Sequence, residues 1–136
     1  MTPTNTLGHA ALTPAQLGTL RAAVDRIIPA DDYPSGWEAG VGDFLIGLMA
    51  REPQFLPVYQ AGLDAVEAEA HVGGGGPFVD MGASEQDTLL ARLEAAHWSF
   101  FRLLVRQAME GFYADPGNGG NKGGVAWDMI GYKVTA

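Results

Sequence analysis

Apolar residues recur at intervals of three and four along most of this 136-residue chain, a spacing that favours α-helices over strands. Thr13, Pro14 and Gln16 supply a helix N-cap, a proline at the first helical position and a capping-box glutamine. The pattern predicts a first helix that Pro29 ends, because the residue before a proline is pushed out of the α-helical conformation. Its inward residues are Leu17, Leu20, Val24, Ile27 and Ile28.

Three further segments have the same spacing, and Pro53 separates the first two of them. Their apolar stripes consist of Val41, Phe44, Leu45, Leu48 and Met49, and of Phe55, Tyr59, Leu63 and Val66. Four consecutive glycines at 73–76 then predict a flexible crossing. A last stripe runs from Leu89 to Phe112, behind a predicted cap at 84–87. It fits one long helix or two helices with a bend near His97 and Trp98.

No segment has the alternation of a strand, and there is no internal repeat or long heptad pattern. The predicted fold class is therefore all-α, a single small irregular bundle of four to five helices with a glycine-rich C-terminal loop. With 47% hydrophobic residues, the chain can bury one core, so we expect residues 1–136 to form one helical domain. Residues 1–12 precede the first cap and are expected to be a flexible N-terminus.

The charge balance excludes one class of partner. The formal net charge is −8, and the eight lysines and arginines stand singly along the sequence, so phosphate backbones would be repelled. We expect no nucleic acid partner. No apolar run approaches the ~20 residues that span a bilayer, so we expect no transmembrane segment.

No sequence motif indicates a catalytic, cofactor-binding or metal-binding residue. The chain has no cysteine, so thiolate-held iron–sulfur clusters and covalently attached c-type haem are excluded. The histidines lie far apart in sequence, and no serine stands in a nucleophile elbow. The loop GNGGNKGG fits no phosphate-binding pattern, because Lys122 replaces the third glycine. Gly117 and Gly119 follow Asp115 where a calcium loop needs oxygen ligands.

Large aromatic residues are concentrated in or near two loops, one after the first helix and one after the last. Such rings commonly anchor contacts between proteins, and they also cover the ends of a small core. Both interpretations remain open for Trp37, Trp98, Trp127, Tyr33, Tyr113 and Tyr132.

Two stretches together resemble a known family. The segment "RIIPADD…EAGVGDFL", a helical middle, and "QAMEGFYADPGNGGNKGGVAWDMIGY" are similar to the gluconate 2-dehydrogenase subunit 3 family. The resemblance runs from about Leu12 to Val134, and its most specific part extends from Glu110 to Tyr132.

The resemblance implies an accessory role in a heterodimer. In such complexes a large subunit of the glucose-methanol-choline type holds FAD and oxidises a sugar or glycoside, as in glucoside 3-dehydrogenase-like enzymes. The small subunit binds it and supports its folding or flavin loading, and it often brings the export signal. The resemblance thus implies no cofactor in this chain, FAD in the partner, and a cytochrome c subunit as a further partner. Many members begin with a twin-arginine signal that this sequence lacks. We therefore expect a cytoplasmic protein as written, and a periplasmic one if the chain is a processed or truncated form.

The C-terminal loop is the main predicted interface. Its glycines permit close or left-handed backbone conformations, its asparagines stabilise turns, and its flanking aromatic residues would fix it to the helices. The predicted partner-interface residues are Trp37, Phe112, Tyr113, Asp115, Pro116, Asn118, Gly119, Gly120, Asn121, Trp127 and Tyr132.

Two alternatives remain open. One is a stand-alone small enzyme or sugar-binding module whose pocket would be formed by Asp31, Asp32, His97, Trp127 and Asp128. It predicts a concave pocket and a monomer, whereas an accessory subunit predicts a large exposed apolar and aromatic patch. The other alternative is a self-associating structural protein.

Overall fold

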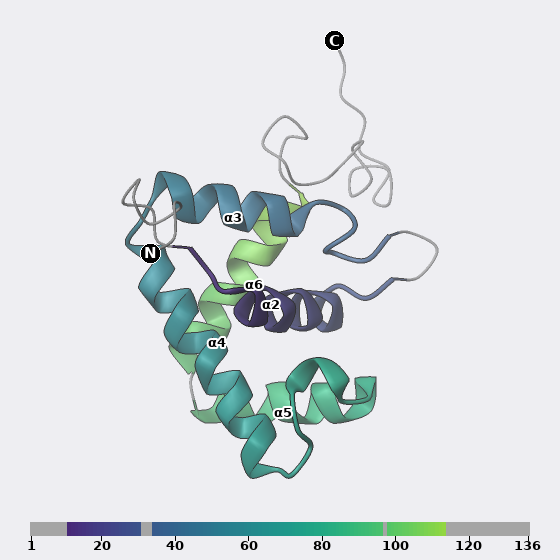
Figure 1. Ribbon diagram of the computed structural model, residues 1–136. Helices are drawn as coiled ribbons and strands as arrows, with labels where there is room; N and C mark the ends of the chain where they lie inside the picture. The colour runs from purple at the N-terminus through teal and green to yellow at the C-terminus, as the bar shows by residue number, and fades with distance from the viewer. Residues whose placement is uncertain (1–10, 31–33, 97, 114–136) are drawn as a thin grey trace.

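The structure is a computed structural model that describes residues 11–30, 34–96 and 98–113 of the chain. In this part it contains five α-helices, one short 3-10 helix and no strand, so the predicted all-α class is confirmed (Figure 1). In chain order the elements are α2 (Pro14–Ile27), α3 (Val41–Arg51), α4 (Phe55–Val72), η1 (Phe78–Asp80), α5 (Ala83–Ala96) and α6 (Trp98–Phe112). The glycine-rich C-terminal loop lies outside the described residues.

The helix α2 begins and ends where the sequence predicts. Thr13 Oγ1 accepts a hydrogen bond from the Gln16 backbone N–H, and Gln16 Oε1 accepts one from the Thr13 N–H, each at 3.0 Å. This capping box satisfies two N–H groups that the helix itself leaves without partners. At the other end, Ile28 leaves the helical conformation one residue before Pro29.

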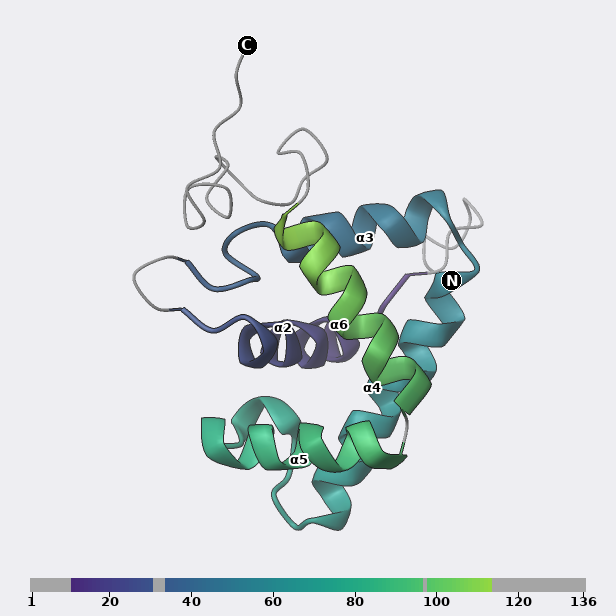
Figure 2. The same cartoon turned by 180° about the vertical axis from the view of Figure 1, so that it is seen from behind.

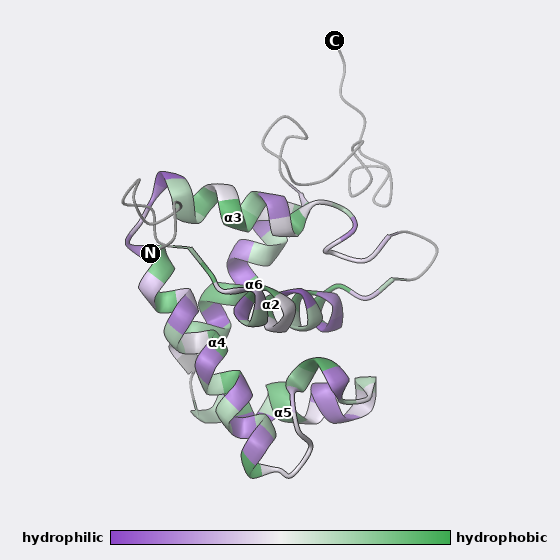
Figure 3. Cartoon of the chain, viewed as in Figure 1, coloured by the Kyte–Doolittle hydropathy of each residue, from purple (hydrophilic) through white to green (hydrophobic). Residues whose placement is uncertain are grey.

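The helix α2 is the centre of the bundle. Figure 1 shows α3 above α2 and α5 below it, with α4 crossing at one side. Figure 2, from behind, shows that α6 crosses α2 on the opposite face and ends beside the start of α3. Hydrophilic and hydrophobic residues alternate along α2 and α4, as expected for helices with one buried face (Figure 3).

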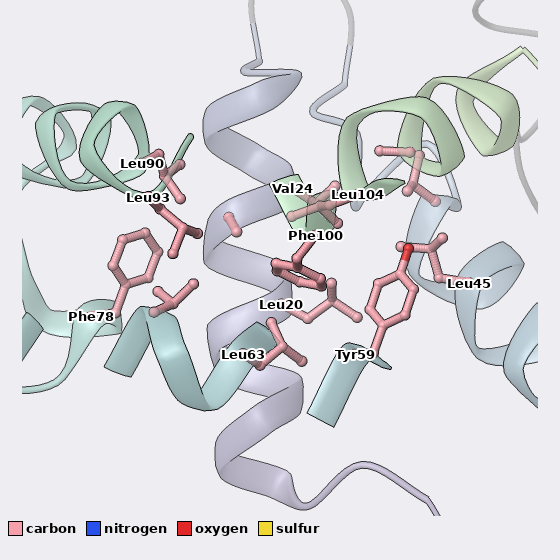
Figure 4. Close-up of a cluster of buried hydrophobic side chains, with 14 of the residues drawn as sticks. Leu20, Val24, Leu45, Tyr59, Leu63, Phe78, Leu90, Leu93, Phe100 and Leu104 are labelled. Atoms are coloured by element: carbon pink, nitrogen blue, oxygen red, sulfur yellow. The ribbon is translucent and has the colours of Figure 1, made fainter. Parts of the chain in front are cut away.

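Side chains from all five helices meet in one hydrophobic cluster. Figure 4 shows Phe78, Leu90 and Leu93 on one side of α2 and Tyr59 and Leu45 on the other. The stripes predicted from the sequence supply most of this core. The largest fully buried side chains are Tyr59, Phe78, Phe112, Leu20, Leu45, Leu63, Leu89, Leu93, Leu104, Val24, Val41 and Val66.

The last apolar stripe forms two helices, α5 and α6, and not one long helix. The chain between them passes through His97, which lies outside the described residues. The predicted cap at 84–87 is displaced, because α5 already begins at Ala83. Glu85 Oε1 instead accepts a hydrogen bond from the Gly82 N–H at 3.1 Å, as the acidic member of a capping box does.

The connection from α4 to α5 contains an element that the periodicity did not indicate. Phe78 in η1 is fully buried, and its backbone N–H donates to the Glu67 carboxylate of α4. The Phe78 carbonyl accepts a hydrogen bond from Gln86 Nε2 of α5 at 2.8 Å. Glu67 also accepts a hydrogen bond from the Thr19 hydroxyl of α2 at 2.8 Å. Polar side chains thus join α2, α4, η1 and α5.

The tetraglycine segment forms the turn that leads into η1. Gly74 and Gly76 have φ angles of 75° and 72°, in the left-handed region that L-residues other than glycine seldom adopt. The backbone conformation of the turn therefore requires glycine at positions 74 and 76. In the described part of the chain, no helix combines the length and the apolar character needed to cross a membrane.

Candidate functional site

The structure describes Trp37, Phe112 and Tyr113 among the predicted interface residues. The others lie outside the described residues: Asp115, Pro116, Asn118, Gly119, Gly120, Asn121, Trp127 and Tyr132. So do all members of the alternative pocket, Asp31, Asp32, His97, Trp127 and Asp128. The site is therefore built from the described surface at the ends of α3 and α6 and along α4.

The loop before α3 is fixed to α2. Asp25 Oδ1 of α2 accepts a hydrogen bond from the Trp37 backbone N–H at 3.0 Å, and the Gly36 N–H donates to the Ile28 carbonyl at 2.8 Å. Ser35 and Glu38 cap one another, since each side chain accepts a hydrogen bond from the other's backbone N–H. This segment holds Trp37 in one place relative to the bundle.

Trp37 packs closely against Gly42 in the first turn of α3. A Cβ atom placed on Gly42 would lie 2.7 Å from the Trp37 ring, so only glycine leaves room for the indole at this position. Gly40, the N-cap residue of α3, has a φ angle of 101° and turns the chain into the helix. Trp37 is partly buried against the core.

The end of α6 packs against the same part of α3. A Cβ atom on Gly111 would lie 2.7 Å from the Phe44 ring, so the two helices approach closely here. Phe112 is only 2% exposed and belongs to the core. Tyr113 is 38% exposed, and its ring meets that of Phe112 edge to face with centroids 5.1 Å apart. Phe112 thus supports Tyr113 from within.

We call this region, with Trp37, Phe44, Phe112 and Tyr113, the α3–α6 end. The structure brings the described members of the predicted interface to one end of the molecule, although 75 positions separate Trp37 from Phe112 (112 − 37). Figures 1 and 2 both show the end of α6 beside the start of α3. The most specific part of the resemblance begins at this end, at Glu110 of α6, and continues past the described residues.

A second surface was not predicted. Two adjoining hollows between α4 and α6, which share Val58, Ser99 and Phe100, form what we call the α4–α6 groove. The larger hollow has a volume of about 660 Å³. The described residues that line the groove are Val58, Ala61, Gly62, Ala65, Ala96, Ser99, Phe100, Arg102, Leu103 and Arg106.

The two arginines correct an expectation drawn from the sequence. Lysines and arginines stand singly along the chain, yet Arg102 and Arg106 both line this groove. They are four residues apart on α6, and such positions lie on the same face of a helix. That spacing was the signal that could have revealed the pair.

The floor of the groove is closely packed. A Cβ atom on Gly62 would lie 2.3 Å from the Phe100 ring, so this ring fills the space that a side chain would otherwise occupy. The Phe100 ring meets Tyr59 edge to face at a centroid distance of 5.7 Å. Tyr59 Oη donates a hydrogen bond to Gln107 Oε1 at 2.7 Å, and both side chains are buried. Burial, with a smaller contribution from nearby Glu110, raises the pKa of Tyr59, so its hydroxyl stays protonated and can donate.

A third hollow lies where the chain enters α2. It is almost wholly apolar, with a volume of about 240 Å³, and Ile46 on its rim is 44% exposed. Its lining residues are Ala11, Leu12, Leu17, Ile46, Met49, Ala50 and Leu56. Leu12, in the segment expected to be flexible, packs against the core.

Within residues 11–30, 34–96 and 98–113, no group of three or more His, Cys, Asp or Glu side chains could hold a metal ion. The side chains that line the α4–α6 groove are apolar, small or cationic. Such a surface can bind an apolar group with a negative charge nearby.

Comparison with known proteins assigns the chain to a family. A family model described as gluconate 2-dehydrogenase subunit 3 matches residues 14–133. The match begins at the first residue of α2 and includes every described helix. No curated protein and no solved structure matches the chain.

Proposed function

Because this chain belongs to the gluconate 2-dehydrogenase subunit 3 family, we propose that it is the non-catalytic small subunit of a dehydrogenase complex. The large subunit would hold FAD and oxidise a sugar or glycoside. The observation that carries the proposal is the extent of the family match, which includes the whole described bundle from Pro14 onward. The family description names a dehydrogenase subunit, and the finer role is our inference.

In the proposed complex, the small subunit supports the large subunit by binding to it. It forms a heterodimer with the large subunit and assists its folding or flavin loading, and a cytochrome c subunit can join the complex as a further partner. The exposed ring of Tyr113 and the partly buried ring of Trp37 support this role, because aromatic residues are enriched in the centres of protein interfaces. Both lie at the α3–α6 end, which is backed by the close packing of Phe44 on Gly111.

Co-purification tests this proposal. The chain would be co-expressed with an affinity-tagged FAD-dependent dehydrogenase encoded beside it, and the eluate examined by size-exclusion chromatography with light scattering. We expect a stable complex of the two chains. A large subunit that elutes alone, at its own mass and with its flavin, would contradict the proposal. A tagged, unrelated flavoprotein is the control for non-specific capture.

A further inference from the structure

We propose that the α4–α6 groove binds an acidic amphipathic helix of the large subunit. The inference rests on the proposed function, since it names the surface by which the small subunit engages that partner. It adds a second contact region to the α3–α6 end, carried by residues that the interface prediction did not include.

The shape of the groove fits a helix. Its walls are the two helices α4 and α6, and small side chains at Ala61, Ala65 and Ser99 line the space between them. The distance between packed helices depends on the side chains at the contact, so small residues permit a close approach. Helices commonly bind in this way, with apolar residues three and four positions apart in an apolar groove.

The groove is also apolar where a helix would contact it. Val58, on its rim, is 40% exposed, although a valine in a helix of a small bundle would ordinarily be turned inward. Leu103 is partly buried beside it. Phe100 forms the floor, and its ring packs closely against Gly62 and Tyr59. An apolar side chain of a partner would remove this surface from water.

The charge of the groove indicates the sign of the charge on the partner helix. The whole chain has a net charge of −8, yet the described lining of the groove contains Arg102 and Arg106 and no carboxylate. Both groove arginines are exposed on α6. A helix with Asp or Glu along one edge would complement them through charge-assisted hydrogen bonds.

Charge reversal of the two arginines is the first test. The Arg102→Glu/Arg106→Glu variant would be measured against the purified large subunit by biolayer interferometry at low and high salt. We expect the dissociation constant to rise about tenfold or more at low salt, because like charges would then face each other. The matched control is Arg21→Glu/Arg51→Glu, which changes the net charge equally at exposed arginines outside the groove. It should bind as the unmodified chain does.

A steric variant makes the test independent of charge. Ala61→Trp places a large ring in the groove from an exposed position of α4, where the fold should accept it. Circular dichroism would verify that every variant keeps its helices. We expect Ala61→Trp to weaken binding as well, and it remains informative if the double reversal fails to fold.

The outcomes separate the two proposals. Tight binding by the unmodified chain and equally tight binding by both groove variants would overturn the docking surface and leave the proposed function intact. No binding by the unmodified chain would overturn both. If the chain instead forms a dimer by itself, and the groove variants abolish that dimer, the occupant is a second copy of this chain and the proposal is wrong.

Discussion

At the scale of single residues, the buried pair Tyr59 and Gln107 is the clearest test of the core. Their hydrogen bond of 2.7 Å joins α4 to α6 inside the bundle. Tyr59→Phe removes the donor and leaves the buried amide oxygen of Gln107 without it. We expect the free energy of unfolding to fall by about 1–3 kcal/mol, the cost of a buried polar group without its partner. Chemical denaturation followed by circular dichroism measures this loss.

The double variant Tyr59→Phe/Gln107→Leu is the control. It removes both partners, so no polar atom of the pair is left buried, and we expect part of the lost stability to return. The loss in the free energy of unfolding of the double variant is compared with the sum of the losses of Tyr59→Phe and Gln107→Leu. If the double variant loses more than this sum, the hydrogen bond is not the reason for the loss.

Gly62 provides a second prediction at this scale. Alanine is normally better than glycine in a helix by about 1 kcal/mol. At Gly62, however, the new methyl group would lie 2.3 Å from the Phe100 ring, and overpacking of a core costs about 1–3 kcal/mol. We expect Gly62→Ala to lower the melting temperature.

Gly18 of α2 is the matched control, because a Cβ atom there would meet Val79 Cγ1 at an ordinary 3.6 Å. Gly18→Ala should raise the melting temperature. Equal effects of the two substitutions would show that the Phe100 ring does not restrict position 62.

Residue roles were the least predictable part of the site. Phe112 belongs to the last apolar stripe and was also predicted at the interface, and only the packing of α6 on α3 shows that it is buried. The sequence could place Trp37 in a loop, but not against Gly42, because that contact depends on the φ angle of Gly40. The Arg102 and Arg106 pair was visible as a four-residue spacing, but its groove depends on how α4 crosses α6.

At the scale of elements, the cap of α2 is testable. Thr13→Ala removes the acceptor for the Gln16 N–H at the start of the central helix. We expect a loss of about 0.5–2 kcal/mol in the free energy of unfolding, as for other N-caps. Thr88→Ala is the control, since the Thr88 hydroxyl only bonds the Ser84 carbonyl within α5 on an exposed face. If Thr88→Ala lowers the free energy of unfolding as much as Thr13→Ala does, the effect of Thr13→Ala is not specific to the cap.

The link between α2 and α5 predicts a pH dependence. Arg26 holds the Asp87 carboxylate through two hydrogen bonds of 2.8 and 3.0 Å, and this lowers the pKa of Asp87. A lowered pKa means that the carboxylate stabilises the folded state above its ordinary pKa near 3.8, and that this contribution disappears as the pH falls through the folded value. The Asp87 side chain is about half exposed to water, so the effect on stability is small.

We therefore expect unmodified protein to be slightly more stable than Asp87→Asn at about pH 7, with the difference narrowing as the pH falls below about 4 and through the lowered pKa of Asp87. Denaturant titrations of both proteins across this range measure it. A difference that grows as the pH falls would contradict the ion pair.

Elements with a long apolar stripe and a clear cap could be predicted from the sequence. The bounds of α2 follow from Thr13 and Pro29, since both act locally. The sequence left open whether the last stripe forms one helix or two, because no proline or glycine interrupts the stripe near His97, and the structure shows two, α5 and α6. The 3-10 helix η1 was missed for a similar reason. Its buried Phe78 is fixed by Glu67 and Gln86 from two other elements, and a short window of sequence contains no sign of these contacts.

At the scale of the whole molecule, the five described helices surround one core and leave two surfaces suited to a partner. The α3–α6 end presents Tyr113, and the α4–α6 groove presents apolar residues beside Arg102 and Arg106. The fold class and the family could be inferred from sequence, because both rest on patterns that span most of the chain. The groove could not, since it exists only where two helices cross.

The flavin content of the large subunit tests most directly whether this chain is its accessory subunit. The neighbouring FAD-dependent dehydrogenase would be expressed with and without this chain, and bound flavin measured by absorbance together with dehydrogenase activity per large subunit. We predict co-purification, with flavin and activity both reduced when this chain is omitted. Full flavin content and full activity in its absence, with no association between the two chains, would contradict the proposed role as an accessory subunit.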